Sequence, residues 1–97
     1  MATVPGLSWS ARPDGWVNGA RALASDHHDE RSLASTVDLL VIHHISLPPG
    51  RFSGDAIERL FTGTLDCGAH PYFAGLAGLR VSAHFLIRRR GELCQFV

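Results

Sequence analysis

Histidine and cysteine are the residues of this chain whose side chains could do chemistry, and two histidines stand side by side. His43 and His44 follow four consecutive apolar residues, Leu39 to Ile42, and precede Ser46 and a Pro-Pro-Gly turn. Imidazole nitrogens bind metal ions and transfer protons near neutral pH. Open α/β sheets place their sites at the carboxyl ends of strands, so the pair occupies a position where chemistry is expected.

A metal site is the first chemical possibility. A catalytic zinc needs about three protein ligands and one open position. The candidate ligands in the chain are His43, His44, His70, His84 and two cysteines. No histidine pair shows the HxxxH spacing that sets two ligands on one helical face. Residue types and spacing alone therefore favour a structural role for any single histidine over a metal-binding one, and both interpretations stay open at this point.

A cysteine nucleophile is the second chemical possibility. Cys67 or Cys94 could pair with His70 or His84, because a thiol nucleophile is activated by an adjacent base. Cys94 lies in an apolar run, where a thiol is usually an inert small hydrophobe. Cys67 lies in a glycine-rich stretch with no identifiable base. The spacing thus gives this possibility little support.

The element expected to carry the histidine pair is a central strand over residues 36–45, TVDLLVIHHI. The run is rich in Val, Ile and Leu, and residues 39–42 do not alternate with polar residues, as in a strand covered on both faces. Side chains alternate along a strand, so His43 and His44 are expected to face opposite ways. The prolines after Ser46 end the strand.

Residues after this strand predict a short helix. Ile57, Leu60 and Phe61 have the i, i+3, i+4 spacing of one apolar helical face. Acidic residues lie in its early turns, where the helix dipole favours them. Gly63 is a plausible end. Residues 63–79 then read as a loop.

The ends of the chain predict less regular structure. Residues 80–97 alternate in polarity and predict a β-hairpin with a type I′ turn at Arg90-Gly91, where arginine is a poor first residue. Residues 1–14 are expected to be flexible, and residues 20–24 could form a short helix. His27 and His28 lie in a charged run and are interpreted as exposed surface histidines.

Composition bounds the class of protein. The chain has 97 residues, enough for one domain with a modest core. Nine basic residues, all arginine, balance nine acidic ones, which does not suggest a nucleic-acid surface. There is no signal peptide and no run of about 18 apolar residues, so a cytoplasmic protein without a membrane partner is the default expectation. Because the chain stops inside the apolar run ELCQFV, we expect it to be truncated or the first part of a longer protein.

Four stretches together resemble a known family. They are GWVNGARAL (15–23), VIHHISLPPGRF (41–52), LFTGTLD (60–66) and HPYFAGLAGLRVSAHFLIRRRGELCQFV (70–97). They closely resemble the cytoplasmic AmpD-type 1,6-anhydro-N-acetylmuramoyl-L-alanine amidases. These belong to the wider zinc amidase group that includes the peptidoglycan recognition proteins. The resemblance covers the chain from about Gly15 onwards.

The resemblance implies a fold and a chemistry. The fold is α/β, a mixed β-sheet flanked by helices, present here as the first and incomplete part of an amidase type 2 domain. One Zn²⁺ at the mouth of the sheet would activate a water to attack the amide between the muramoyl lactyl group and L-alanine. The substrate would be a muropeptide of peptidoglycan recycling.

The resemblance also implies roles for individual residues. His43 matches the first zinc ligand of the family, and His44 stands where asparagine is common. Arg80 matches an arginine suited to a peptide-stem carboxylate, and Phe61 matches an aromatic residue near the substrate groove, although core packing is its default role. Ala83 falls where some relatives carry a catalytic tyrosine, which places the chain with the members that take a glutamate from elsewhere.

The remaining zinc ligands, the catalytic glutamate and a lysine follow the hairpin in this family. We therefore expect no catalytic residue within the chain, and expect the 97 residues alone to be inactive. The alternatives are a non-catalytic muropeptide-binding module and a degenerate truncated product.

Overall fold

The computed structural model describes residues 10–97. Most of the stretch 1–14 that was expected to be flexible lies outside the described residues. Its last part is ordered, because β1 (Ser10–Ala11) pairs antiparallel with β2 (Val17–Asn18). Asp14 stabilises the connecting turn by accepting a hydrogen bond from the Trp16 amide at 3.1 Å.

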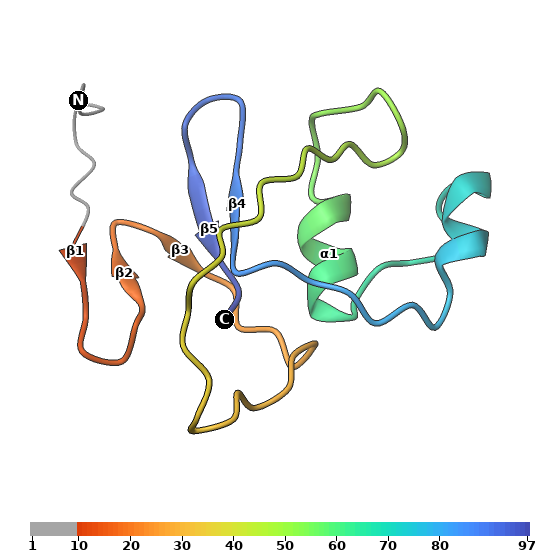
Figure 1. Ribbon diagram of the computed structural model, residues 1–97. Helices are drawn as coiled ribbons and strands as arrows, with labels where there is room; N and C mark the ends of the chain where they lie inside the picture. Colours follow the sequence, from red (N-terminus) through yellow and green to blue (C-terminus); the bar gives the residue numbers. More distant parts are fainter. Residues whose placement is uncertain (1–9) are drawn as a thin grey trace.

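A three-stranded mixed sheet forms the centre of the molecule. Its order is β3 (Arg21–Ala22), β5 (Leu93–Gln95), β4 (Phe85–Ile87), with β3 parallel and β4 antiparallel to β5. In Figure 1 the β1–β2 pair lies on one side of this sheet and α1 (Ala56–Thr62) on the other. The mixed sheet with flanking helices confirms the predicted α/β class.

Residues 20–24 form strand β3 and its continuation instead of the short helix that was expected. The Leu23 amide donates to the Gln95 carbonyl at 2.9 Å, and the Ser25 amide donates to the Phe96 carbonyl at the same distance. Backbone pairing with a distant strand thus overrides a weak local preference for helix.

Helix α1 forms where the apolar spacing predicted it. Ile57, Leu60 and Phe61 are buried on one face. Gly63 ends the helix in the left-handed conformation at φ 76°, and its amide donates to the Leu60 carbonyl at 3.3 Å. Glycine adopts this conformation without the steric cost that a Cβ brings. The buried face joins the core, which also contains Leu47, Phe73, Leu86, Cys94 and Phe96.

The hairpin of β4 and β5 lies within residues 80–97, but its strands are shorter and its turn is different. The Arg88 amide donates to the Glu92 carbonyl at 2.8 Å, and the Gly91 amide donates to the Arg88 carbonyl at 2.9 Å. Only Gly91 in this turn has a positive φ, of 85°. Such a three-residue loop needs a left-handed residue at one position, so arginine at position 90 costs nothing and the predicted type I′ turn is wrong.

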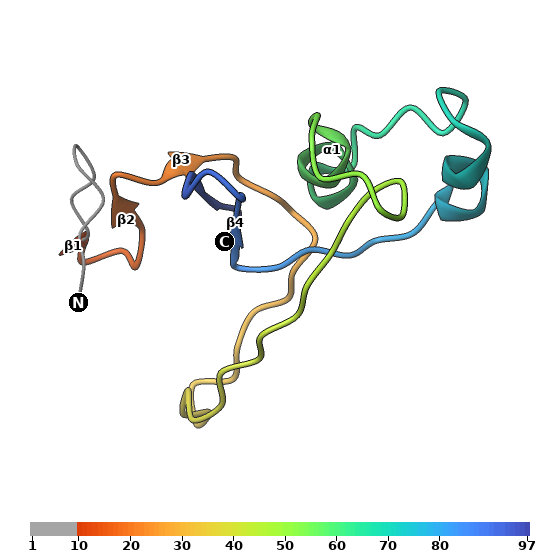
Figure 2. The ribbon, with the colours of Figure 1, turned by 90° about the horizontal axis from the view of Figure 1, so that it is seen from above.

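The predicted central strand over residues 36–45 is not formed. The segment has no strand pairing, and Leu39 to Ile42 are 76–87% exposed. Figure 2 shows the loop that includes the start of this segment reaching away from the sheet and from α1. A strand requires a neighbour for its backbone groups, and no described residue supplies one here. The segment is apolar, as the sequence shows, but the predicted burial of residues 39–42 is wrong.

The stretch 63–79 contains one short element. A 3-10 helix, η1 (Pro71–Leu76), follows His70, which is extended at φ −153° and ψ 141° as expected before a proline. The His70 Nδ1 atom accepts a hydrogen bond from the Tyr72 amide at 3.0 Å. No helix among residues 10–97 is long and apolar enough to cross a membrane.

Candidate functional site

The histidine pair lies on the exposed segment. The rings of His43 and His44 are 5.9 Å apart between centroids and nearly parallel, with 14° between their planes. Both side chains are exposed. The rings therefore lie beside each other and do not point to opposite faces, because no sheet holds this segment in a regular pleat.

The residues present do not form a zinc site on their own. Residues 10–97 contain no group of three or more histidine, cysteine or acidic side chains placed to hold a metal ion. A catalytic zinc takes three protein ligands, and the adjacent imidazoles offer two at most. His43 is free to contribute one ligand because its ring is exposed.

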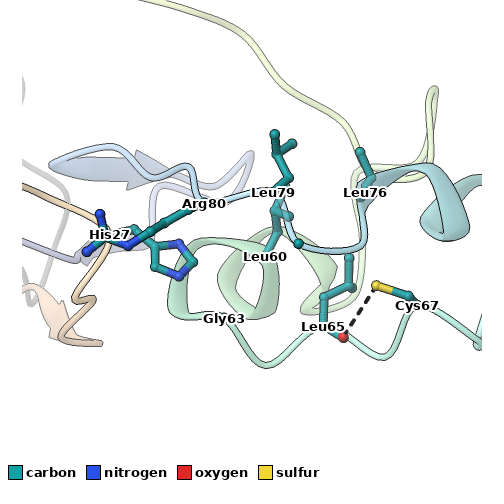
Figure 3. A pocket seen from close by; sticks show the side chains of 9 residues that line it. His27, Leu60, Gly63, Leu65, Cys67, Leu76, Leu79 and Arg80 are labelled. Atoms are coloured by element: carbon teal, nitrogen blue, oxygen red, sulfur yellow. Dashed lines mark hydrogen bonds between the residues drawn. The ribbon is translucent and has the colours of Figure 1, made fainter.

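A cavity of about 300 Å³ lies between α1, the loop after it and the segment that leads to Arg80 (Figure 3). Most of its wall is apolar, and two cationic or titratable side chains, His27 and Arg80, lie together at one end. The lining residues are His27, Leu60, Gly63, Leu65, Cys67, Leu76, Gly78, Leu79 and Arg80. Such a cavity suits a ligand with an apolar body and a negatively charged group.

Arg80 is exposed and is held from one side. Its guanidinium donates a hydrogen bond to the Asp26 carbonyl. A guanidinium carries five N–H donors, so most of its donors stay available to a ligand. A carboxylate is the ligand group that fits its planar fork best.

His27 is largely buried, contrary to the prediction of an exposed surface histidine. Its side chain is 10% exposed, and its Nδ1 atom lies 2.9 Å from the Val81 carbonyl oxygen. Its Nε2 atom faces Gly63 so closely that a Cβ at that glycine would lie 3.0 Å away. Its partners are 36 and 54 positions along the chain, and a local reading of the sequence carries no signal for such contacts. His28 is exposed, as predicted.

Phe61 lies in the core and not at a groove. It is 7% exposed, and its ring meets the Phe96 ring edge to face with centroids 5.2 Å apart. This burial agrees with its default packing role. A substrate contact by Phe61 stays a prediction that the burial does not favour.

Neither cysteine is paired with a histidine in the part of the chain that the structure describes. Cys67 Sγ donates to the Leu65 carbonyl at 3.8 Å, and Cys94 Sγ lies 3.6 Å from a Glu92 carboxylate oxygen. Burial, together with the negative charge of Glu92, raises the pKa of Cys94 to about 11. The protonated thiol is a poor nucleophile, so Cys94 is a core residue.

Comparison with known proteins places these features in a family. No family model matches the chain. The chain is 58% identical over 84 residues to the 1,6-anhydro-N-acetylmuramyl-L-alanine amidase AmpD of Citrobacter freundii. This match covers 87% of this chain and 45% of the relative. Its identity to the AmpD of Escherichia coli K12 is 59% over 83 residues, or 86% of this chain and 45% of the relative. The AmpD of Haemophilus influenzae is 46% identical over 83 residues, or 86% of this chain and 45% of the relative.

Solved structures agree with the sequence matches. A crystal structure of a selenomethionine AmpD derivative superposes with a TM-score of 0.80 at 58% identity, over 84% of this chain and 46% of that one. The solution structure of Citrobacter freundii AmpD superposes with a TM-score of 0.51, over 91% of this chain and 47% of that one. The chain thus spans a little under half the length of the relatives it matches. By sequence and by fold, the chain is therefore similar to a part of the AmpD-type amidases.

Proposed function

We propose that this chain is part of an enzyme that hydrolyses the amide between anhydro-N-acetylmuramic acid and L-alanine in muropeptides. Support comes from relatives named 1,6-anhydro-N-acetylmuramyl-L-alanine amidase at 46–59% identity over most of the chain. The family resemblance extends the proposal to cytoplasmic peptidoglycan recycling. Identity of this level over more than 80 residues is the observation that carries the proposal.

His43 is proposed to supply one ligand of a catalytic Zn²⁺. Its imidazole is exposed, and it sits in the stretch VIHHISLPPGRF that resembles the family. The other ligands would come from the part of an AmpD-type protein that this chain does not span. Since the described residues hold no cluster of three metal ligands, we propose that the 97 residues alone do not turn over substrate.

Arg80 and the cavity beside it are proposed to receive the peptide stem. The guanidinium would bind a stem carboxylate while the leucine-lined wall packs against apolar parts of the ligand. His44, beside the proposed zinc ligand, would meet the sugar side of the scissile amide as a hydrogen-bonding group.

A chimera tests the proposal. The matching segment of the Escherichia coli relative is replaced by this chain, and hydrolysis of an anhydromuropeptide is followed by release of the free peptide. The chimera should be active, and His43→Ala should lower its activity by more than about a hundredfold. Loss of a metal ligand should cost more than loss of a residue that only hydrogen-bonds to a ligand, which typically costs about 10- to 100-fold. His28→Ala is the matched control and should keep full activity. An active His43→Ala chimera would overturn the assignment.

A non-catalytic muropeptide-binding module is the second candidate. The observation that favours it is the cavity, which forms within the described residues although a metal cluster does not. Calorimetry of the 97-residue chain with muropeptide and zinc tests for binding, and the activity of the chimera separates the two candidates. Binding without turnover, combined with an inactive chimera, would favour the module.

A further inference from the structure

We propose that His27 is a positioning residue that holds Arg80 at the mouth of the cavity. The inference deepens the proposed function and rests on its assignment of Arg80 as the carboxylate-binding residue. His27 lies outside the four stretches on which the family resemblance was based, and the proposed metal chemistry does not use it. Its role is argued from three sets of contacts that fix the segment Ser25–His27 against the rest of the fold.

Ser25 anchors the segment to the helix and the sheet. It is 5% exposed, and its amide donates to the Phe96 carbonyl at 2.9 Å. Its hydroxyl donates to the Phe61 carbonyl in the last turn of α1, where helix carbonyls lack partners within the helix. The same oxygen accepts from the His27 amide at 3.0 Å. The backbone at residue 27 is therefore fixed before its ring makes any contact.

The His27 ring then fixes the backbone segment that carries Arg80. Its Nδ1 atom lies 2.9 Å from the Val81 carbonyl oxygen. A carbonyl oxygen can only accept, so Nδ1 carries the proton and donates. On the other side of the ring, Nε2 faces Gly63, where a Cβ would lie 3.0 Å away, and the exposed Asp26 carboxylate lies 3.7 Å from the same atom.

Asp26 completes the arrangement through its backbone. Its carbonyl accepts a hydrogen bond from the Arg80 guanidinium, while its own carboxylate is 90% exposed. Residues 26 and 27 thus hold residues 80 and 81 at two points, one on the side chain and one on the backbone. In Figure 3 the His27 ring and the Arg80 side chain lie next to each other at one end of the cavity. A guanidinium oriented in advance loses less conformational entropy when a carboxylate binds.

The first test needs no substitution and no ligand. Nitrogen-15 NMR of the imidazole rings in the 97-residue chain reads the tautomer of His27 at a pH where it is neutral. The proposal expects the Nδ1–H tautomer for His27. A proton on Nε2 in the neutral ring would break the bond to Val81 and overturn the proposal.

The second test measures the order of the Arg80 side chain. Hydrogen exchange of its guanidinium protons should accelerate roughly two- to tenfold in His27→Ala, as expected for one lost hydrogen bond. His27→Asn should restore slow exchange, because an asparagine Nδ2 lies where His27 Nδ1 lies and also donates. His28→Ala, at the exposed neighbouring histidine, should change nothing. Unchanged exchange in a folded His27→Ala protein would contradict the proposal.

A third test connects the positioning role to ligand binding. The dipeptide L-alanyl-glutamate serves as the carboxylate probe, and its dissociation constant is measured by NMR titration. It should rise roughly two- to tenfold in His27→Ala and recover in His27→Asn. If the dipeptide does not bind even the unaltered chain, the assignment of Arg80 fails. The tautomer and exchange results then still decide whether His27 positions Arg80.

Discussion

Two short segments of this chain show opposite relations between composition and burial. Residues 39–42, Leu-Leu-Val-Ile, are the most apolar run in the sequence, yet they are 76–87% exposed. Residues 25–27, Ser-Asp-His, are polar, yet the Ser25 side chain and the His27 ring are largely buried. Burial here follows the partners that a segment finds, and not its hydropathy.

The physical reason differs between the two segments. The polar segment can be buried because its groups are satisfied, with Phe61, Val81 and Phe96 supplying carbonyl acceptors. The apolar run has no element across from it among the described residues. The run therefore stays exposed although its composition favours burial.

The largest effect is expected in the core that both segments approach. Phe96→Ala removes a ring that is 1% exposed and packs edge to face on Phe61. It should lower the free energy of unfolding by about 3–5 kcal/mol, measured by urea unfolding. Phe52→Ala is the matched control at a ring that is 42% exposed, and its cost should be much smaller. Equal losses for the two variants would mean that the core is not where the structure places it.

Ser25→Ala tests whether the polar segment is held by its hydrogen bonds. The substitution leaves the Phe61 carbonyl and the His27 amide without their partner. A loss of about 1–3 kcal/mol in the free energy of unfolding is expected, the cost of a buried unsatisfied group. Ser35→Ala, at an exposed serine, should change stability by less than about 0.5 kcal/mol. A neutral Ser25→Ala would show that apolar contacts alone hold the segment.

The buried thiol of Cys94 makes the stability of the core depend on pH. Its folded pKa of about 11 lies above the usual 9.0, so the folded state keeps a proton that the unfolded state has lost between these values. Stability from this group is present below pH 9 and falls as pH rises toward 11, by at most about 1.4 kcal/mol per pH unit. Urea unfolding from pH 8 to 11 measures the decline, which Cys94→Ala should reduce.

Thiol labelling gives an independent check on the same residue. At pH 8 a maleimide should modify the half-buried Cys67 and leave Cys94 unmodified in the folded chain. Cys67→Ser should abolish labelling of the native protein. Fast labelling of Cys94 under native conditions would show that β5 is open to solvent.

The smallest effect on stability is expected in the apolar run. Ile42→Ser removes a side chain that is 87% exposed, and it should change the free energy of unfolding by less than about 0.5 kcal/mol. The substitution should instead reduce self-association, because exposed β-prone apolar runs promote association between chains. Light scattering at rising protein concentration measures this change. A loss comparable to that of Phe96→Ala would show that the run is buried in solution.

Local features of the sequence were enough to predict several elements. The i, i+3, i+4 spacing of Ile57, Leu60 and Phe61 and the stop at Gly63 located α1, because a helix is held by contacts within a few residues. The hairpin within residues 80–97 was predicted from alternation, but its turn was not. The turn type depends on which residue takes a positive φ, and the strands around it decide that.

In the candidate site, too, some features could be predicted from the sequence and others could not. The identity of the histidine at position 43 and the family resemblance of the stretches around it could be read from residues alone. The position of Arg80 beside His27 could not, because it depends on contacts between residues more than 50 positions apart. Nothing in the charged run 25–32 indicates that one of its two histidines is buried.

The sequence by itself determined the α/β class, the helix and the family, since these depend on local periodicity and on an ordered set of motifs. Tertiary structure alone decided which apolar run is buried and which polar segment closes the cavity. Burial is a property of pairs of segments: Ser25 and His27 have neighbours that satisfy them, and residues 39–42 have none among the described residues.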